Sequence, residues 1–367
     1  QALGRGYSDD PNETYNSCLE NINKAVEINN NDFEAHRMLA EVHITLHDFE
    51  KAKMHGAKSF RINPNDPRVL SVYGEALLRT GQIDSGIEYL EKKLKEAKKN
   101  KKLPKIIVTV HFAGQPTIQE KINSLKKIYK FKIIEDASHS IGSSRKNNLV
   151  GNCKWSDITV FSFHPVKIIT TGEGGAICTK NPKLAEKVKT LRSHGIVKDP
   201  KLFKNKFYGP WSYEQQTLGF NYRMNDIQAA LGISQINRLD QIISERNRLL
   251  NLYKNKLSQL PLYFLDIPQD VLSSVHLCVI CLNQCTENQH RDIFEALRGK
   301  GIGTQLHYWP VHLNPYYRDL GFKEGDFINS EIYANRALSL PLFPGLKDVE
   351  INYVSHILEE TIKDIID

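Results

Sequence analysis

The order of apolar and polar residues divides the chain into two parts with different periodicities. In the first hundred residues the pattern is helical and repeats itself, whereas after Pro104 short β-rich runs alternate with a segment of helical spacing. A helix buries one stripe of side chains and a strand buries alternate ones, so this change marks a boundary between two architectures. We therefore expect an α-helical repeat segment over residues 1–103, followed by an α/β protein.

The N-terminal part contains two units that match each other at an offset of 34 residues. Small residues at Ala40, Ala52 and Gly74 allow two helices to approach closely, and Pro64 ends the second helix of its unit. The period and these positions resemble tetratricopeptide repeats, which implies a concave helical scaffold that binds a protein partner and does no chemistry. The matching positions are Ala40 with Gly74, His43 with Leu77, Ile28 with Ile62, and Asn30 with Pro64.

The part after Pro104 predicts a layered α/β architecture. KIIVTV, FKIIED, DITVFSF and GAICTK have the composition of short strands, and IQEKINSLKKIYK between the first two has helical spacing. A long helical stretch runs from Asn225 to Leu257, and the last hundred residues mix short strands with helices. We expect an α/β domain over residues 104–235 and a small α+β domain over residues 236–367.

Composition narrows the functional classes. The 367 residues are 40% hydrophobic and 25% charged, which is ordinary for a globular protein, and the net charge of +7 is mild. Much of that charge lies in a lysine-dense run from Lys92 to Lys105 without interleaved aromatic residues, so we expect no nucleic-acid partner. No apolar stretch approaches the ~20 residues that span a bilayer, so we expect no membrane association. Six cysteines do not suggest a disulfide framework, which favours the cytoplasm, and a start at QALGRGY without methionine leaves an upstream segment open.

One group of metal-ligand side chains lies in the last hundred residues. The string HLCVICLNQC brings His276, Cys278, Cys281 and Cys285 within ten residues. The string also has the pattern of a buried strand, in which His276 and Cys278 would face away from Cys281. No second pair follows at zinc-knuckle spacing. We expect an apolar strand and no metal, with a four-ligand site as the alternative.

Candidate chemistry gathers just past two of the predicted strands. The string IIED places Glu135 and Asp136 at the carboxyl end of one strand, and Ser162, His164 and Lys167 follow another. Ligands of α/β sheets bind at this edge. A desolvated lysine is nucleophilic towards carbonyls, a carboxylate can hold a protonated ring nitrogen, and a hydroxyl with backbone N–H groups can take a phosphate. These are the needs of pyridoxal phosphate, and the alternative is an aspartate capping a turn beside a lysine that reaches to solvent.

Five strings in order carry a resemblance to a known family. They are VHFAGQP, EDASHSIGS, FSFHPVKIITTGEGGAICT, LGFNYRMNDIQAALGISQ and LHYWPVHLNPYYRDLGF. From about Lys105 to the C-terminus the chain resembles the sugar-nucleotide aminotransferases of the DegT/StrS family. The nearest subgroup is the transaminases of pseudaminic acid synthesis, which aminate C4 of UDP-4-keto-6-deoxy-N-acetyl-altrosamine. The resemblance implies a pyridoxal-phosphate-dependent, aspartate-aminotransferase-like (fold type I) large domain and a small α+β C-terminal domain.

The resemblance also implies residue roles. Lys167 would bond to the cofactor aldehyde and then move protons, Asp136 would pair with the ring nitrogen, and His139 would lie beside the phenolic oxygen. Ser162 would bind the phosphate. The implied reaction takes an amino group from glutamate to a UDP-keto sugar, in a homodimer. Asn221 and Arg223 are implied to reach the cofactor phosphate of the neighbouring subunit, and His307 and Tyr308 to contact substrate.

The chain departs from the family before VHFAGQP. The first strands of the large domain should precede this string, with a Gly-Thr loop that cups the phosphate and an aromatic residue that stacks on the cofactor ring. The repeats stand there instead, so we expect an incomplete large domain, and a strand at Ile106–Val110 that is poorly covered on at least one side. An inert transferase part that serves a tetratricopeptide binding scaffold is the alternative function.

Overall fold

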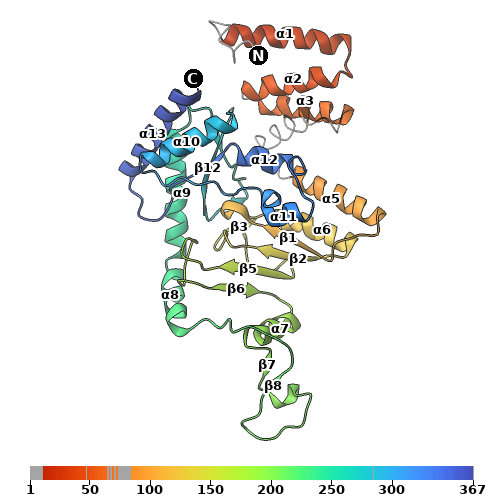
Figure 1. Ribbon diagram of the computed structural model, residues 1–367, viewed down its shortest axis with the longest axis vertical. Helices are drawn as coiled ribbons and strands as arrows, with labels where there is room; N and C mark the ends of the chain where they lie inside the picture. Colours follow the sequence, from red (N-terminus) through yellow and green to blue (C-terminus); the bar gives the residue numbers. More distant parts are fainter. Residues whose placement is uncertain are drawn as a thin grey trace.

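A computed structural model describes residues 11–46, 48–63, 66, 68, 69, 72, 84–283 and 285–366. Three N-terminal helices lie at one end, a four-stranded sheet occupies the middle, and a C-terminal α+β part lies beside that sheet (Figure 1). The repeat positions Pro64, Gly74 and Leu77 lie outside the described residues. The second repeat unit therefore stays a prediction, as does the tetratricopeptide assignment itself.

The N-terminal helices pack as consecutive antiparallel neighbours would. They are α1 (Pro11–Ile28), α2 (Phe33–Thr45) and α3 (Phe49–Ile62), with contacts between α1 and α2 and between α2 and α3. Ala40 and Ala52 are completely buried, which agrees with the expectation that small residues let the helices approach closely.

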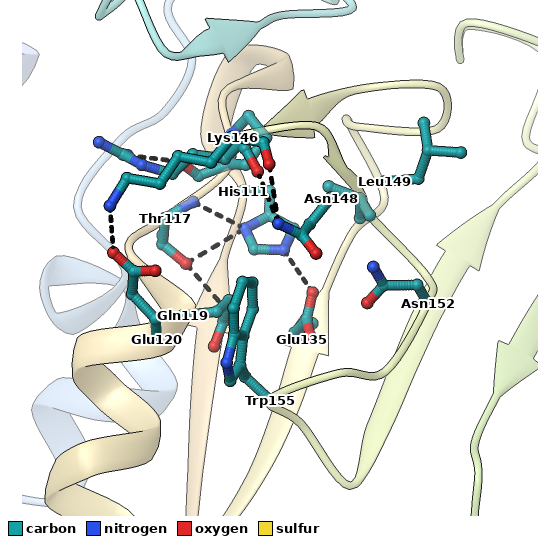
Figure 2. Close-up of a pocket in the computed structure, with 13 residues that line it drawn as sticks. His111, Thr117, Gln119, Glu120, Glu135, Lys146, Asn148, Leu149, Asn152 and Trp155 are labelled. Atoms are coloured by element: carbon teal, nitrogen blue, oxygen red, sulfur yellow. Dashed lines mark hydrogen bonds and ion pairs between the residues drawn. The ribbon is translucent and has the colours of Figure 1, made fainter.

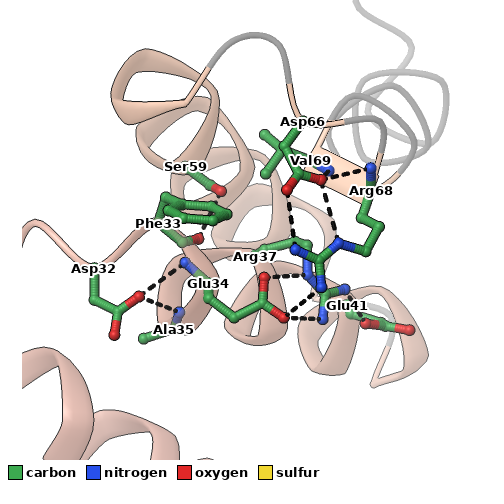
Figure 3. Close-up of polar contacts among 10 residues, drawn as sticks. All are labelled: Asp32, Phe33, Glu34, Ala35, Arg37, Glu41, Ser59, Asp66, Arg68 and Val69. Atoms are coloured by element: carbon green, nitrogen blue, oxygen red, sulfur yellow. Dashed lines mark hydrogen bonds and ion pairs between the residues drawn. The ribbon is translucent and has the colours of Figure 1, made fainter.

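Polar contacts fix the ends of these helices (Figure 3). Asp32 begins α2, because its carboxylate accepts hydrogen bonds from the backbone N–H groups of Glu34 and Ala35 at 2.9 and 3.2 Å. Ser59 of α3 donates to the carbonyl of Phe33 at 2.7 Å and so joins the two helices. Arg68 forms an ion pair with Glu34 at 3.2 Å, which links residues one repeat period apart.

The central sheet contains the four strands that the sequence predicts. Its order is β1-β2-β5-β6; β1, β2 and β5 are parallel, and β6 is antiparallel to β5. The strands are β1 (Ile106–Val110), β2 (Lys132–Asp136), β5 (Ile158–Ser162) and β6 (Gly175–Cys178). Parallel pairing brings the carboxyl ends of β1, β2 and β5 to one edge, where the candidate residues stand.

Two helices cover one face of this sheet at β1 and β2. These are α5 (Asp84–Lys99) and α6 (Gln119–Tyr129), which pack on each other. They enclose a cluster with Leu94, Phe131 and Ile133, each at most 2% exposed. The apolar stripe of α5 therefore packs on the α/β part, although the sequence prediction assigns this segment to the repeats.

The opposite face is open at β1. Ile106, Val108 and Val110 are 51%, 57% and 50% exposed, and Ile177 on β6 is 49% exposed. Among the described strands, β1 pairs only with β2 and is therefore an edge strand. The prediction that Ile106–Val110 is poorly covered on one side is confirmed, and the described helices do not extend the sheet.

The C-terminal part has a separate core. Its antiparallel sheet has the order β12-β11-β9, and β11 (Cys278–Leu282) is buried at every position. The predicted helix from Asn225 to Leu257 is two helices that meet at Asn237 and Arg238. The helices and outer strands are α8 (Asp226–Ile236), α9 (Leu239–Lys256), β9 (Leu262–Phe264), α10 (Glu287–Gly299), β12 (Ala337–Leu340) and α13 (Asp348–Ile366).

The cysteines of HLCVICLNQC lie in this core. Cys278 belongs to the cluster around Leu249 and Leu358, whereas Cys281 packs in another cluster with Val279 and Ala113. The two thiols therefore face opposite sides of β11, as its alternation predicts. Across the part of the chain that the structure describes, no three metal-ligand side chains gather as an ion would need.

The remaining described elements lie in the connections of the chain, and some of their strands form two further small sheets. They are η2 (Phe112–Gly114), β3 (Ser144–Arg145), β4 (Asn148–Leu149), α7 (Pro182–Arg192), β7 (Ile196–Val197), η3 (Pro200–Leu202), β8 (Glu214–Gln215), β10 (Val271–Leu272), η4 (Val311–Leu313), α11 (Pro315–Asp319) and α12 (Ile328–Ala334). The pairing of β10 with β3 ties the C-terminal part to the loop after β2. None of the described helices is long and apolar enough to cross a membrane.

Candidate active site

A tightly closed loop after β5 positions Lys167. The backbone N–H of Lys167 donates to the carbonyl of His164 at 3.0 Å, and Thr171 donates back to the carbonyl of Phe163 at 3.0 Å. Gly174 has a φ of +157°, and a Cβ there would stand 2.3 Å from Thr171 Oγ1. Gly174, the second glycine in TTGEGG, is therefore required by the loop that holds the lysine.

Lys167 and Asp136 interact electrostatically at the carboxyl edge of the sheet. Lys167 is half-buried, and burial lowers the pKa of its amine, while the negative charge of Asp136 opposes that shift. Asp136 Oδ1 accepts hydrogen bonds from the backbone N–H and the hydroxyl of Ser138, at 3.1 and 2.6 Å. The arrangement places a partly desolvated amine within electrostatic range of an oriented carboxylate.

His139 lies in the same group of side chains. Burial, and then the positive charge of Lys167, lower the pKa of His139 to about 4, so the imidazole is neutral at neutral pH. Its Nδ1 accepts a hydrogen bond from the backbone N–H of Ala113 at 3.3 Å. The ring proton then belongs to Nε2, which lies 3.3 Å from the hydroxyl of Tyr308 and can donate to it.

The C-terminal part contributes His307 and Tyr308 to this group. Nδ1 of His307 lies 2.8 Å from Ser339 Oγ, and the Tyr333 hydroxyl donates to the His307 carbonyl at 2.8 Å. Burial and the charge of Lys167 lower the pKa of His307, and burial raises that of Tyr308. The structure thus brings together residues that stand about 140 positions apart.

Three other predicted site residues lie apart from this group or at its margin. Ser162 ends β5 on the same face of the sheet as Asp136, and its Oγ accepts a long hydrogen bond from the N–H of His164 at 3.4 Å. Asn221 and Arg223 are exposed on the segment that joins β8 to α8. Their predicted role towards a neighbouring subunit stays a prediction.

The cavity in Figure 2 is a different site, beside Glu135. His111 is completely buried, and its Nε2 lies 2.8 Å from the carboxylate of Glu135. Glu135 and Asp136 are consecutive in β2, so their side chains lie on opposite faces of the sheet. The cavity volume of about 30 Å³ suits a water molecule rather than a cofactor. One carboxylate of IIED is therefore structural, and the other lies on the opposite face and interacts electrostatically with Lys167.

Sequence reasoning missed several residues that hold this site. Ser138 orients Asp136, and its place two residues after an aspartate was a signal, because such residues close local turns. His276 was considered only as a metal ligand, yet its ring lies 4.3 Å from that of His139. The contact of Ser339 with His307 had no signal, because the two residues meet only through the C-terminal sheet.

A pyridoxal-type cofactor needs partners for its aldehyde, its ring nitrogen and its phosphate. These residues provide the first two. Lys167 offers an amine of lowered pKa for the aldehyde, and Asp136 offers a carboxylate for a ring nitrogen. On the phosphate side, Ser162 is the one predicted residue at the sheet edge. Lys167, Asp136, His139 and Ser162 would hold the group from this chain, and His307 and Tyr308 stay predicted substrate contacts.

Comparisons with known proteins assign most of the chain to one family. The sequence model of the DegT/DnrJ/EryC1/StrS aminotransferase family matches residues 79–359. The chain is 36% identical over 261 residues to UDP-4-amino-4,6-dideoxy-N-acetyl-beta-L-altrosamine transaminase of Campylobacter jejuni, covering 71% of this chain and 66% of the relative. It therefore spans about two thirds of that relative's length. The family match begins before α5, in the segment assigned from sequence to the repeats.

Solved structures show the same fold. Helicobacter pylori PseC, described as an aminotransferase involved in the biosynthesis of pseudoaminic acid, matches with a TM-score of 0.65 at 30% identity. The match covers 72% of this chain and 68% of that one. A sugar aminotransferase of Streptococcus pneumoniae matches at 0.65 and 25% identity over 71% and 70%, and it has been solved in PMP and PLP forms. The comparisons thus confirm pyridoxal phosphate as the cofactor of the matched proteins' family.

Proposed function

Since the chain belongs to the DegT/DnrJ/EryC1/StrS aminotransferase family, we propose that it is a pyridoxal-phosphate-dependent sugar-nucleotide aminotransferase. The observation that carries this proposal is the meeting of half-buried Lys167 with Asp136 and His139 at one sheet edge. A lysine that merely reached to solvent would have no reason to lie among buried histidines and an oriented carboxylate.

Each residue of the group has a task in that reaction. When bound, the cofactor supplies an aldehyde that exchanges amino groups and a ring that accepts electron density. Nζ of Lys167, with its lowered pKa, is available as a nucleophile and as the carrier of a proton. Asp136 would stabilise a positive charge on the ring nitrogen, and Ser138 keeps that carboxylate in place. His139 donates from Nε2 and remains neutral.

The substrates follow from the relatives. The Campylobacter transaminase and Helicobacter PseC support a 4-keto-6-deoxy UDP-sugar as the amino acceptor, in pseudaminic-acid-type or other surface glycan synthesis. Glutamate is the proposed amino donor. His307 and Tyr308 are the proposed sugar contacts, which is supported by the electrostatic interaction of His307 with Lys167 and of Tyr308 with Asp136. We further propose a homodimer in which Asn221 and Arg223 reach the neighbouring site, in the cytoplasm.

The alternative is an inert scaffold in which only the repeats act. The comparisons give this alternative no support, and the lysine, carboxylate and histidine of the site are all present. A protein partner of the repeats is compatible with either function.

The test is a visible spectrum of the purified protein titrated with pyridoxal phosphate, before and after borohydride, followed by peptide mapping. We expect an absorption band that borohydride removes and a label on Lys167 alone. Lys167→Ala should lose both the label and any glutamate-driven turnover, since the residue is the covalent anchor and the proton carrier.

Lys183→Ala is the matched control, because Lys183 is exposed in the first turn of α7. It should keep the band and the label. Labelling of another lysine would contradict the assignment of Lys167, and a protein that takes up no cofactor at all would favour the inert scaffold.

A further inference from the structure

Two backbone segments meet near His139, and each contains a residue in the left-handed conformation. Ala113 in η2 has a φ of +56°, and Val275 shortly before β11 has a φ of +47°. Neither residue is a glycine, and a β-branched valine rarely adopts this conformation. Strained backbone of this kind persists where the contacts around it determine its position, and it is common at functional sites.

The turn at Ala113 directs one backbone group at the histidine. The N–H of Ala113 donates to Nδ1 of His139 at 3.3 Å, and the carbonyl of Ala113 accepts from the N–H of His276 at 2.9 Å. This residue therefore contacts both the imidazole of the candidate site and the C-terminal part. A donor at Nδ1 leaves the ring proton on Nε2.

Three buried serines fasten this turn to the segment before β11. Ser143, Ser273 and Ser274 are each at most 2% exposed. The hydroxyls of Ser143 and Ser273 lie 2.7 and 3.0 Å from the carbonyl oxygen of Gly114. Position 114 requires a glycine, since its φ is +96° and a Cβ would stand 2.7 Å from Ser274 Oγ and from the backbone nitrogen of Val275.

Ser274 connects the serine network to His139. Its hydroxyl donates its one proton to the carbonyl of His139 at 2.9 Å. Oγ of Ser143 lies 2.9 Å from Oγ of Ser274 and can donate to it, while Ser273 supplies the proton for the carbonyl of Gly114. Each hydroxyl proton in the network has an acceptor, and the series of hydrogen bonds ends on the backbone of His139.

The segment 273–276 is anchored in the C-terminal part. Nη1 of buried Arg246, on α9, donates to the carbonyl of Val275 at 3.2 Å. Nδ2 of Asn247, on the same helix, donates to the carbonyl of Ser273 at 2.9 Å. The conformation of the turn in η2 therefore depends on how the C-terminal part packs against the loop after β2.

We propose that Ser274 is a positioning residue for His139. Its hydroxyl holds the backbone of the histidine, and the turn that the serine network fastens holds the imidazole in the form with its proton on Nε2. Packing of the C-terminal part thereby sets which nitrogen of His139 can donate a hydrogen bond. The inference rests on the proposed function only for the use of this donor in transamination, since the contacts themselves involve no cofactor.

The experiment compares the full chain with Ser274→Ala, both without cofactor. Nitrogen NMR reports which nitrogen of each histidine ring carries the proton, a spectrum of His139→Gln assigns the signal, and hydrogen exchange reports the amide of Ala113. In the parent chain we expect the His139 proton on Nε2 and a protected Ala113 amide. In Ser274→Ala the ratio of the Nε2–H to the Nδ1–H form and the protection of Ala113 should each fall about fivefold, the effect expected from losing one hydrogen bond.

A second variant and a matched control complete this test. Ser143→Ala removes the donor to Ser274, so it should shift both readouts in the same direction by a smaller amount. Circular dichroism identifies a variant that does not fold, and the other variant then carries the test. Ser59→Ala is the control, because Ser59 is 1% exposed and its hydroxyl donates to the carbonyl of Phe33 at 2.7 Å, between α2 and α3. It also loses one buried hydrogen bond, yet both readouts should stay unchanged.

The reaction with glutamate tests the use of the positioned ring. With pyridoxal phosphate bound, Ser274→Ala should react with glutamate about fivefold more slowly, with the same dependence on glutamate concentration, since the residue touches no substrate. A normal rate in a variant whose ring proton has shifted would overturn the role in catalysis.

Two NMR results would overturn the proposal itself. One is a His139 proton on Nδ1 in the parent chain, and the other is an unchanged ratio of the two forms in both serine variants. A parent chain with the expected NMR results but no reaction with glutamate would contradict the proposed function and still support the positioning of His139 by Ser274.

Discussion

Two strands of five residues, β1 and β11, have similarly apolar sequences and opposite surroundings. IIVTV of β1 has one buried position out of five, whereas CVICL of β11 is buried at all five. β11 lies between β9 and β12 and under the helices of the C-terminal core, while β1 is an edge strand with one open face. An apolar sequence therefore shows that a strand can be buried, but the strands and helices packed around it determine whether it is buried.

The central sheet and the C-terminal part contribute different residues to the candidate site. The open sheet carries the reactive amine and carboxylate at its strand ends, in Lys167 and Asp136. The closed C-terminal part supplies most of the described apolar core and brings His276, His307 and Tyr308 to that edge. The candidate site is therefore assembled where a well-packed region meets an incompletely covered one.

The largest effect on stability is expected from shortening a buried side chain in the C-terminal sheet. Ile280→Ala should lower the free energy of unfolding by about 2–5 kcal/mol, because the side chain is completely buried between β9 and β12. Urea unfolding measures the change. A loss below about 1 kcal/mol would show that the core around β11 relaxes around the cavity, and the contrast with β1 would weaken.

The next prediction concerns a substitution in the central sheet that should lower turnover without lowering stability. Asp136→Asn should lower turnover about 100-fold or more, because an amide cannot stabilise a positive ring nitrogen, while Ser138 can still donate to it. Steady-state kinetics with glutamate and circular dichroism measure the two properties. Glu135→Gln is the control on the opposite face, and it should keep turnover. Full turnover by folded Asp136→Asn would make the carboxylate structural.

Buried His276, where the two regions meet, predicts that the stability of the fold depends on pH. Burial, then the charges of His139, Lys167, Arg246 and His307, lower the pKa of His276 to about 2. The unfolded chain binds that proton near pH 6.5 and the folded chain does not, so stability should fall as pH drops below about 6.5. The slope is at most about 1.4 kcal/mol per pH unit for this histidine.

His276→Gln tests this dependence. The variant should flatten part of the slope in unfolding experiments between pH 7 and pH 5. His356→Gln is the control, because the side chain of His356 is 66% exposed on α13. An unchanged slope in His276→Gln would show that other groups carry the acid sensitivity.

The smallest expected effect is in the open strand. Ile106→Ala should change the free energy of unfolding by less than about 0.5 kcal/mol, because half of the side chain is already in water. Urea unfolding beside Ile280→Ala compares the same substitution in the two regions. A loss comparable to that of Ile280→Ala would mean that the face around Ile106 is covered in solution.

Much of the fold and site could be predicted from the sequence. The strands KIIVTV, FKIIED, DITVFSF and GAICTK form, and Lys167, Asp136 and His139 meet, because strand ends in a parallel sheet share one edge. The break between α8 and α9 at Asn237 was missed, since both flanking segments keep helical spacing. The packing of α5 on α6 was missed because an amphipathic stripe does not name its partner.

The sequence by itself determined the local elements, the family and the residue types that the chemistry needs. These depend on short-range periodicity and on strings such as FSFHPVK, which are readable without a fold. Only the tertiary structure decided that Glu135 pairs with buried His111 while its neighbour Asp136 interacts electrostatically with Lys167. Only the tertiary structure decided that β11 is enclosed and β1 open. Burial and the pKa values that follow from it depend on contacts between distant segments, which no local pattern specifies.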